Sequence, residues 1–241
     1  MRQGETTPTF ALGDVDIKTV RRAQIFRGVD EADAGALLGK FKVVTARPHT
    51  EIFRQGDDPG GSLYVVIDGR VALSRSGPGS QTATIAVLGP PDMFGELSVF
   101  DPGPRTSTAV ALTDARLAEL PGEALLSWAE TRPVIARRLL QVLGRRLRRT
   151  NAVIGDLVFV DVPGRVAKAL LDLAERFGVA TPQGVRVDHE LTQSELAHVV
   201  GASRETVNKA LADFTVRGWI THATGTVTLL DTARLARRAG L

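Results

Sequence analysis

The sequence contains no cysteine among its 241 residues, and this absence excludes several kinds of site at once. Without thiols the chain can form no disulfide, no thiolate metal site and no iron–sulfur cluster held by cysteine. The four histidines, at positions 49, 189, 198 and 222, do not have the spacing of metal ligands. We therefore expect no bound metal and no redox sensing through thiols.

Long hydrophobic runs are also missing from the chain. No apolar stretch approaches the roughly 18 residues that a membrane-spanning helix needs. The first twenty residues, which include Pro8 and Gly13, lack the continuous apolar segment of a secretion signal. With 43% hydrophobic and 24% charged residues, the composition is that of a folded chain with a buried core. We expect a cytoplasmic protein without a membrane partner.

Charge is unevenly distributed along the sequence. Residues 1–130 carry 13 Lys and Arg against 17 Asp and Glu, whereas residues 131–241 carry 17 against 10, so the two parts have net charges of −4 and +7. A basic second part beside an acidic first part suggests that only the second meets a polyanion such as nucleic acid. A solvated, arginine-rich surface is the alternative that charge alone leaves open.

Short β-type runs dominate residues 41–120. The runs at 63–67, 71–73 and 84–88 are rich in β-branched and apolar residues, and turn sequences rich in Asp, Pro and Gly separate them. This alternation predicts a compact antiparallel barrel or roll. A helical stretch is predicted before it, from about Ile17 to Leu38, and we expect no regular structure in the polar leader.

A long helix is predicted after the roll. Thr131 and Pro133 are good helix-start residues, and the helical pattern continues from there to about Val160. One stripe of this helix has alternate spacings of three and four residues: Leu140, Leu143, Leu147, Thr150, Ile154 and Leu157. This is the spacing of a coiled-coil seam, and it predicts that the helix pairs with a second copy of itself.

The same stripe could instead pack on the chain's own β-roll. Ile135, Leu139 and Val142 already form a second apolar face suited to that contact, and this favours dimerisation through the seam. The arginines around the seam are interpreted as its solvated flanks: Arg145, Arg146, Arg148 and Arg149.

The long helix is expected to end at Asp161-Val162-Pro163-Gly164, because a residue before proline is pushed out of the helical region. We interpret this segment as an interdomain hinge. Pro163 can open the next helix, whose apolar face runs from Val166 to Phe177 before Gly178 ends it. The predicted organisation is a leader at 1–16, a domain at 17–130, a dimerisation helix at 131–161 and a second domain at 162–241.

A helix-turn-helix is predicted near the C-terminus. Thr192-Gln193-Ser194-Glu195 has the form of a capping box that opens a short helix, and Gly201 supplies the turn after it. A second helix starts at Ser203 and buries apolar residues at helical spacing: Val207, Ala210, Leu211 and Phe214. Its outward face then carries Arg204, Glu205, Asn208 and Lys209.

These outward side chains suit the edges of DNA bases. Arg204 can donate two hydrogen bonds to guanine, Glu205 can accept one from cytosine, and Lys209 can reach a guanine or a phosphate. Taken alone, an Arg-Glu pair at a helix start is an ordinary surface ion pair. Residues 219–221 and 227–230 read as the hairpin of a winged helix, and this context favours DNA binding.

Four segments resemble those of the catabolite activator (CRP/FNR) family of transcription regulators: residues 94–100 (FGELSVF), 104–107 (PRTS), 161–166 (DVPGRV) and 200–207 (VGASRETV). The resemblance covers about residues 17–238 and is strongest to the cyclic-AMP receptor proteins of high-GC Gram-positive bacteria. It implies an α+β protein with an N-terminal cyclic-nucleotide-binding β-roll (jelly roll), a long dimerisation helix and a C-terminal winged helix-turn-helix. The order of these parts agrees with the order predicted from periodicity and charge.

The resemblance also implies where nucleotide and DNA bind. A glycine before a short helix lets backbone N–H groups approach a phosphate, which Arg105 can pair with, while Glu96 suits a ribose hydroxyl. Without the resemblance, Glu96 and Arg105 would be interpreted as an internal salt bridge. The expected nucleotide-binding residues are Gly95, Glu96, Leu97, Ser98, Arg105, Thr106, Thr150 and Asn151, of which the last two meet the purine from different subunits. The expected DNA-binding residues are Thr192, Ser203, Arg204, Glu205, Asn208 and Lys209.

Cyclic AMP is the effector that the overall resemblance favours. A threonine after the phosphate-binding arginine, here Thr106, also occurs in guanine-selective relatives, so cyclic GMP stays open. Thr150 is the polar residue of the seam, which suggests that nucleotide satisfies its hydroxyl and tightens the pairing. The expected partners are a second copy of the chain, double-stranded DNA with a palindromic operator, and RNA polymerase.

Three other functions stay open at this point. A family member with a vestigial pocket would bind DNA without nucleotide. An enzyme would need acid–base residues, for which Asp188-His189-Glu190 is the local candidate, but charged residues are common at such a helix entrance. A haem gas sensor would lack the cysteine that is one usual axial ligand. We expect a regulator with no catalytic residues, no metal and no haem.

Overall fold

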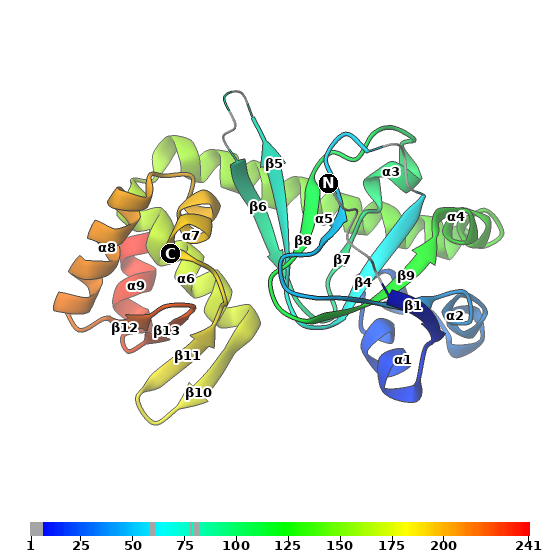
Figure 1. The fold of residues 1–241 in the computed structure, drawn as a ribbon, viewed down its shortest axis with the longest axis horizontal. Helices are drawn as coiled ribbons and strands as arrows, with labels where there is room; N and C mark the ends of the chain where they lie inside the picture. Colours follow the sequence, from blue (N-terminus) through cyan, green and yellow to red (C-terminus); the bar gives the residue numbers. More distant parts are fainter. Residues whose placement is uncertain (1–6, 58–60, 78, 80–81) are drawn as a thin grey trace. The chain divides into compact units, whose positions relative to one another are not determined.

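The computed structural model describes residues 7–57, 61–77, 79 and 82–241, and the chain divides into two compact units (Figure 1). The first unit consists of Met1–Gln81 and Ala86–Leu147, and the second of Thr82–Ile85 and Arg148–Leu241.

Two sheets form the framework of the first unit, and their described pairings are antiparallel. Five strands form one sheet in the order β1 (Thr7–Ala11), β2 (Lys42–Ala46), β9 (Ala115–Pro121), β4 (Ser62–Asp68) and β7 (Met93–Phe94). Four strands form the other in the order β3 (Glu51–Phe53), β8 (Thr108–Ala111), β5 (Val71–Ser76) and β6 (Thr82–Leu88). The antiparallel roll predicted for residues 41–120 is confirmed.

Strand β4 shows why this unit has two buried clusters. Successive side chains of a strand point to opposite faces of the sheet, so Leu63 and Val65 join one cluster and Val66 joins the other. The first cluster is completed by residues of the helices, among them Leu37 and Leu125. The second cluster is formed by residues of both sheets.

The N-terminal part is more regular than we predicted. The leader was expected to have no structure, but β1 pairs with β2 and helix α1 (Asp14–Arg21) begins inside it; residues 1–6 lie outside the described residues. The helical stretch predicted from about Ile17 to Leu38 is present but divided into two helices. A short 3₁₀ turn (Gln24–Phe26) and Asp30, whose carboxylate accepts from the N–H of Asp33 at 2.7 Å, separate α1 from α2 (Glu31–Leu38). Asp30 caps the N-terminus of α2 and thereby starts a new helix.

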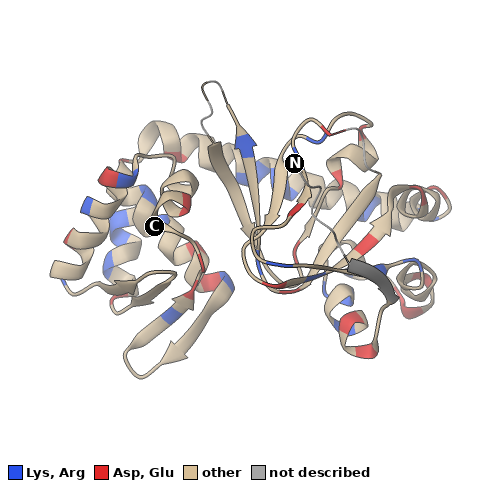
Figure 2. Ribbon diagram, in the orientation of Figure 1, with Lys and Arg blue, Asp and Glu red and all other residues tan. Residues whose placement is uncertain are grey.

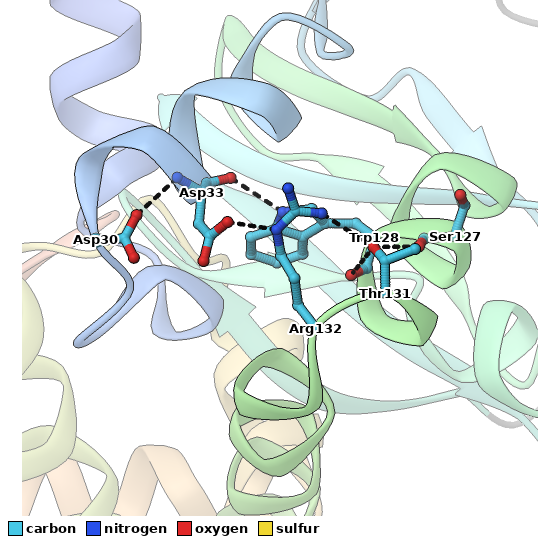
Figure 3. Close-up of polar contacts among 6 residues, drawn as sticks. All are labelled: Asp30, Asp33, Ser127, Trp128, Thr131 and Arg132. Carbon is cyan, nitrogen blue, oxygen red and sulfur yellow. Dashed lines mark hydrogen bonds and ion pairs between the residues drawn. The ribbon is translucent and has the colours of Figure 1, made fainter.

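Helix α4 (Gly122–Glu130) leads into the long helix through a corner fixed by hydrogen bonds (Figure 3). The Thr131 hydroxyl donates to the carbonyl of Ser127 at 3.1 Å, and the indole N–H of Trp128 donates to the carbonyl of Asp33 at 3.0 Å. Arg132 pairs with the Asp33 carboxylate. These contacts tie α2 to the start of the long helix.

The predicted long helix is confirmed as α5 (Pro133–Phe159). Its buried side chains are Ile135, Leu139 and Val142, which join the helix-lined cluster as expected. The stripe interpreted as a seam is open to solvent in the single chain: Leu140, Leu147, Ile154 and Leu157 are 69%, 62%, 55% and 49% exposed. Thr150 is exposed on the same stripe.

The second unit contains the predicted helix-turn-helix and wing. Helices α7 (Gln193–Val200) and α8 (Arg204–Val216) are followed by the hairpin of β12 (Ile220–Ala223) and β13 (Thr226–Leu229). Helix α6 (Val162–Phe177) packs against α7 and α8 and buries Val166, Leu170 and Leu173. The helix predicted to begin near Pro163 is therefore confirmed.

Three elements of this unit were not predicted. Strands β10 (Gly178–Thr181) and β11 (Gly184–Asp188) extend the wing into a sheet of order β10-β11-β13-β12. Helix α9 (Thr232–Ala239) packs on α6 and buries Leu235 and Ala239.

The segment interpreted as a hinge is a short junction between α5 and α6. Asp161 caps α6 by accepting from the N–H of Gly164 at 3.0 Å, and its other oxygen accepts from Arg238 of α9 at 2.6 Å. The Arg238 hydrogen bond holds the pKa of Asp161 below its ordinary value. Arg165 donates to three carbonyls, those of Val160, Val200 and Gly201. The junction is thus tied both to α9 and to the turn of the helix-turn-helix.

Candidate functional site

A buried arginine lies at the centre of the first candidate site. Arg105, in the loop before β8, is only 4% exposed. Its backbone is held on both sides, because its N–H donates to the carbonyl of Asp57 at 3.0 Å and its carbonyl accepts from Gly56 at 2.8 Å. Burial lowers the pKa of the Arg105 guanidinium from its ordinary value. Among the described residues no carboxylate pairs with the Arg105 guanidinium. A buried cation of this kind is a place where an anion gains free energy by binding.

The guanidinium of Arg105 is only partly engaged by the protein. Nη1 donates to the carbonyl of Gly95 at 2.8 Å and to the Ser98 hydroxyl at 3.1 Å, and Nη2 donates to the carbonyl of Ser62 at 3.1 Å. Nε is buried and has no hydrogen-bond partner among the described residues. The N–H of Nε and the second N–H of Nη2 therefore remain for a ligand. Two such donors on one guanidinium match two oxygens of an anion.

Gly95 brings the backbone close to this arginine. Its φ of +82° lies in the left-handed region, and a Cβ there would stand 2.9 Å from the carbonyl oxygen of Ser62 and 3.0 Å from Nη1 of Arg105. Only glycine fits both the conformation and the space. The turn leads directly into the short helix α3 (Leu97–Phe100), whose first N–H groups have no partner within the helix.

Glu96 supplies a buried acceptor beside the arginine. Its side chain is completely buried, one carboxylate oxygen pairs with Arg146, and the other oxygen has no hydrogen-bond partner among the described residues. Burial raises the pKa of Glu96, and the nearby Arg146 opposes that rise. The free oxygen can accept a hydrogen bond from a hydroxyl group.

Arg146 corrects the interpretation of the arginines on α5 as solvated flanks. Arg146 donates to Glu96 and to the carbonyl of Met93, and its side chain is 37% exposed. Arg149 forms an ion pair with Asp172 at 2.8 Å. The alternative of a Glu96–Arg105 salt bridge is not what the structure shows, because the partner of Glu96 is Arg146. Nothing in the sequence distinguished Arg146 from its neighbouring arginines.

The structure brings most of the expected nucleotide-binding residues together in the first unit. Ser98 is 8% exposed and accepts from Arg105, Leu97 is 46% exposed, and Thr106 is exposed next to Arg105 in the chain. Thr150 and Asn151 are exposed side chains on the part of α5 that belongs to the second unit.

The second candidate site is the outward face of helix α8. Thr192 caps α7 in a reciprocal capping box with Glu195, Gly201 turns the chain with a φ of +68°, and Ser203 caps α8. The predicted apolar residues of α8 are buried: Val207, Ala210, Leu211 and Phe214. Packing therefore fixes which side of α8 faces outward. Figure 2 shows the Lys and Arg positions along α8 and α9.

The outward side chains of α8 are held by weak contacts. Lys209 pairs with Glu205 at 2.8 Å, and both side chains are more than 70% exposed. Gln193, which we did not single out in the sequence, accepts from Arg204 at 3.3 Å and from Asn208 at 3.1 Å. Exposed contacts of this kind contribute little free energy, so these side chains can exchange them for contacts with a ligand.

The cluster considered for acid–base chemistry stabilises a corner of the chain. His189 is 5% exposed, its Nδ1 accepts from the N–H of Leu191 at 3.0 Å, and burial lowers its pKa. Asp188 accepts from Arg186 and from the Thr226 hydroxyl. These hydrogen bonds join β11 to β13 and to the start of α7.

The described residues contain no group of three or more His, Cys, Asp or Glu side chains that could hold a metal ion. No helix in the described part of the chain is both long and apolar enough to cross a membrane.

Two family models match the chain. A cyclic nucleotide-binding domain matches residues 43–132, and a Crp-like helix-turn-helix domain matches residues 164–238. The first match contains the buried arginine and the second contains helices α7 and α8.

The chain is also similar to individual proteins. It is 52% identical over 219 residues to the CRP-like cAMP-activated global transcriptional regulator of Mycobacterium tuberculosis, with 90% of this chain and 97% of that protein covered. It is 34% identical over 216 residues to the cyclic AMP receptor protein of Thermus thermophilus, with 90% and 96% covered. A CRP-family regulator of the same organism has a solved structure with a TM-score of 0.69 at 29% identity, covering 82% of this chain and 96% of that one.

Proposed function

Because this chain belongs to the Crp family of transcription regulators, we propose that it binds cyclic AMP and, as a homodimer, binds palindromic DNA more tightly when the nucleotide is present. The observation that supports nucleotide binding best is the pair of unused groups in the buried site. Nε of Arg105 and one oxygen of Glu96 are both buried without a hydrogen-bond partner among the described residues.

A cyclic nucleotide satisfies both groups at once. The two exocyclic oxygens of its phosphate are acceptors for Nε and Nη2 of Arg105, and the 2′-hydroxyl of its ribose is a donor for Glu96. The N–H groups at the start of α3, together with Ser98 and Thr106, complete the set around the phosphate and sugar. Each of these buried groups would gain the hydrogen bond that it lacks. A buried polar group without a hydrogen bond is costly, so binding the nucleotide removes that cost.

The purine base of the nucleotide is proposed to contact the long helix α5. By family resemblance, Thr150 of one subunit and Asn151 of the other meet the purine. We propose cyclic AMP because the relatives from Mycobacterium tuberculosis and Thermus thermophilus are named for it. Cyclic GMP is the alternative suggested by Thr106.

The open stripe of α5 supports the homodimer. Leucine and isoleucine side chains that are about half exposed or more in the single chain repeat at coiled-coil spacing. Burying the exposed part of each of them against a second copy contributes roughly 1–2 kcal/mol. A dimer also brings Asn151 of the second chain to the first chain's nucleotide.

Helix α8 is assigned to the major groove of DNA. Arg204, Glu205, Asn208 and Lys209 are the proposed base-reading residues, while Thr192 and Ser203 at the helix starts are proposed to contact the backbone. The net charge of +7 over residues 131–241 favours binding of a polyanion. We place the nucleotide-binding domain at 17–130, the dimerisation helix at 131–161 and the DNA-binding domain at 162–241.

We propose that the protein is a cytoplasmic regulator without catalytic activity, metal or haem. Its proposed protein partner on DNA is RNA polymerase. Calorimetric titration of the full chain with cyclic AMP tests the nucleotide assignment. Saturable binding of about one nucleotide per chain is expected. The absence of binding would favour the second candidate, a family member with a vestigial pocket that binds DNA constitutively.

A further inference from the structure

An aromatic ring covers one face of the buried arginine. The Cζ atom of Arg105 lies 4.2 Å from the centroid of the Phe53 ring. A guanidinium at this distance is attracted by the π electrons of the ring, and more strongly where water is excluded. We propose that Phe53 is a positioning residue for nucleotide binding, which fixes the plane of the Arg105 guanidinium before the phosphate arrives. This inference rests on the proposed function, because it concerns the same pocket.

The sequence places this ring at the end of a short strand. Phe53 is the last residue of β3 and stands opposite Ala109 of β8, whose small side chain is fully buried. Its ring lies 6.0 Å from the ring of Tyr64 and 5.9 Å from that of Phe94, which stack on each other at 5.3 Å. Phe94 directly precedes Gly95. The ring cluster therefore connects β3 with the turn that carries the nucleotide-binding residues.

Hydrogen bonds alone restrain tilting of the guanidinium only weakly. The acceptors on Ser62, Gly95 and Ser98 fix its rotation within its own plane. They resist tilting out of that plane less well, because hydrogen bonds tolerate moderate changes of angle. A ring whose centroid lies 4.2 Å from Cζ opposes the tilt. Together the two constraints keep the donor edge of Nε and Nη2 directed at the ligand.

A ring also suits this position better than a carboxylate. Burial lowers the pKa of Arg105, which means that burial makes its positive charge costly. A carboxylate would remove that cost but would occupy the N–H donors that the phosphate needs. The Phe53 ring stabilises the charge through its face and uses none of those donors.

The test compares variants of the full chain in calorimetric titration with cyclic AMP. Phe53→Leu removes the ring, Phe53→Tyr keeps it, and Leu73→Ala is the matched control, since Leu73 packs against the same buried cluster as Phe53. We expect Phe53→Leu to weaken cyclic AMP binding about tenfold, while Phe53→Tyr and Leu73→Ala stay close to the original affinity. In an Arg105→Lys background, where no planar guanidinium remains, Phe53→Leu should have little further effect. Equal losses in Phe53→Leu and Leu73→Ala, or no loss in Phe53→Leu, would overturn the proposal.

A second measurement needs no nucleotide and separates this inference from the proposed function. The Nε–H signal of Arg105 can be followed by ¹⁵N NMR in the nucleotide-free protein and identified by its loss in Arg105→Lys. We expect Phe53→Leu to shift this signal and speed its exchange with water, whereas Phe53→Tyr preserves it. If the protein binds no cyclic AMP, the proposed function fails, and the NMR comparison still decides whether Phe53 positions Arg105. An unchanged signal in Phe53→Leu would contradict the inference.

Discussion

Arg146 of helix α5 holds one oxygen of the fully buried Glu96 carboxylate and leaves the other without a hydrogen-bond partner among the described residues. The same helix carries the stripe of exposed leucine and isoleucine side chains that we assign to the dimer. One ion pair therefore joins the pocket to the helix proposed to pair with a second chain. A ribose hydroxyl that donates to Glu96 would therefore bind a carboxylate that is already paired with a residue of α5.

Burial of Glu96 predicts a particular dependence of stability on pH. Because burial raises the pKa of this carboxyl, the folded protein binds its proton more tightly than the unfolded chain does. The contribution of Glu96 to the free energy of unfolding therefore falls as pH rises from the unfolded pKa through the raised folded pKa. The Glu96→Gln side chain carries no charge, so its contribution to stability does not fall with pH. Without nucleotide, the stability of Glu96→Gln relative to the original protein should increase between pH 4 and pH 7.

Urea unfolding at a series of pH values measures this difference. A matched variant is Glu119→Gln, since Glu119 is a carboxylate of strand β9 that is only half-buried. Its relative stability should change less over the same range. A relative stability of Glu96→Gln that stays constant or falls with rising pH would contradict the burial of a charged Glu96.

The seam predicts that a charge at Leu147 separates the subunits. Leu147→Lys removes roughly 1.5–3 kcal/mol of apolar burial per chain and places like charges opposite each other. The chain should still fold, since Leu147 is 62% exposed in the single chain. Sedimentation equilibrium should show a monomer for Leu147→Lys and a dimer for Gln141→Lys, which lies on the same helix outside the stripe. Equal association of the two variants would mean that another surface forms the dimer.

The face of α8 predicts a specific pattern of DNA recognition. The operator should be a two-fold palindrome whose half-site centres lie about one helical turn, ~34 Å, apart. Arg204→Ala should lose roughly 1–3 kcal/mol of discrimination at a single base pair per half-site. Binding to a panel of singly substituted operators measures this, with Arg217→Ala at the other end of α8 as the control. If Arg204→Ala weakens binding uniformly across the panel, Arg204 contacts phosphate instead of a base.

Thr150 is the polar position in the proposed seam and predicts a route for the switch. If nucleotide acts by tightening the seam, Thr150→Leu should tighten it directly, because burial of an apolar side chain adds roughly 1.5–3 kcal/mol. Specific DNA binding should then appear without cyclic AMP. Operator affinity is measured with and without nucleotide, after confirming that the variant is still a dimer. If the variant needs nucleotide as much as the original protein does, the seam does not control DNA binding. Control would then pass through the β-roll and the α5–α6 junction.

Local patterns in the sequence were enough to predict the parts that read DNA. The spacing of Val207, Ala210, Leu211 and Phe214 determines which side of α8 is buried, so it also determines which side is outward. The capping residues Thr192 and Ser203 mark the helix starts by their own side chains. The hairpin β10–β11 was missed although Pro182 and Gly184 flank its turn, a pattern that indicates a hairpin.

Other features depend on contacts between distant residues, which no local pattern reveals. Strand β1 exists because it pairs with β2, and helix α9 buries only Leu235 and Ala239 in a run of alanine and arginine. Arg146 is one of four arginines within five residues, and only the fold shows which of them reaches Glu96. The Phe53–Arg105 contact likewise joins the end of one strand to the loop before another.

We propose that nucleotide in the Arg105 pocket controls DNA binding by α8. The most direct test is the affinity of the full chain for one operator at fixed salt, with and without cyclic AMP, for the original protein and for Arg105→Leu. We predict that cyclic AMP strengthens operator binding of the original protein by about 5–150-fold, the range of typical allosteric coupling. Arg105→Leu should bind weakly with or without nucleotide, while remaining folded and dimeric. Equal affinity of the original protein in the presence and absence of cyclic AMP would contradict control of DNA binding by the nucleotide.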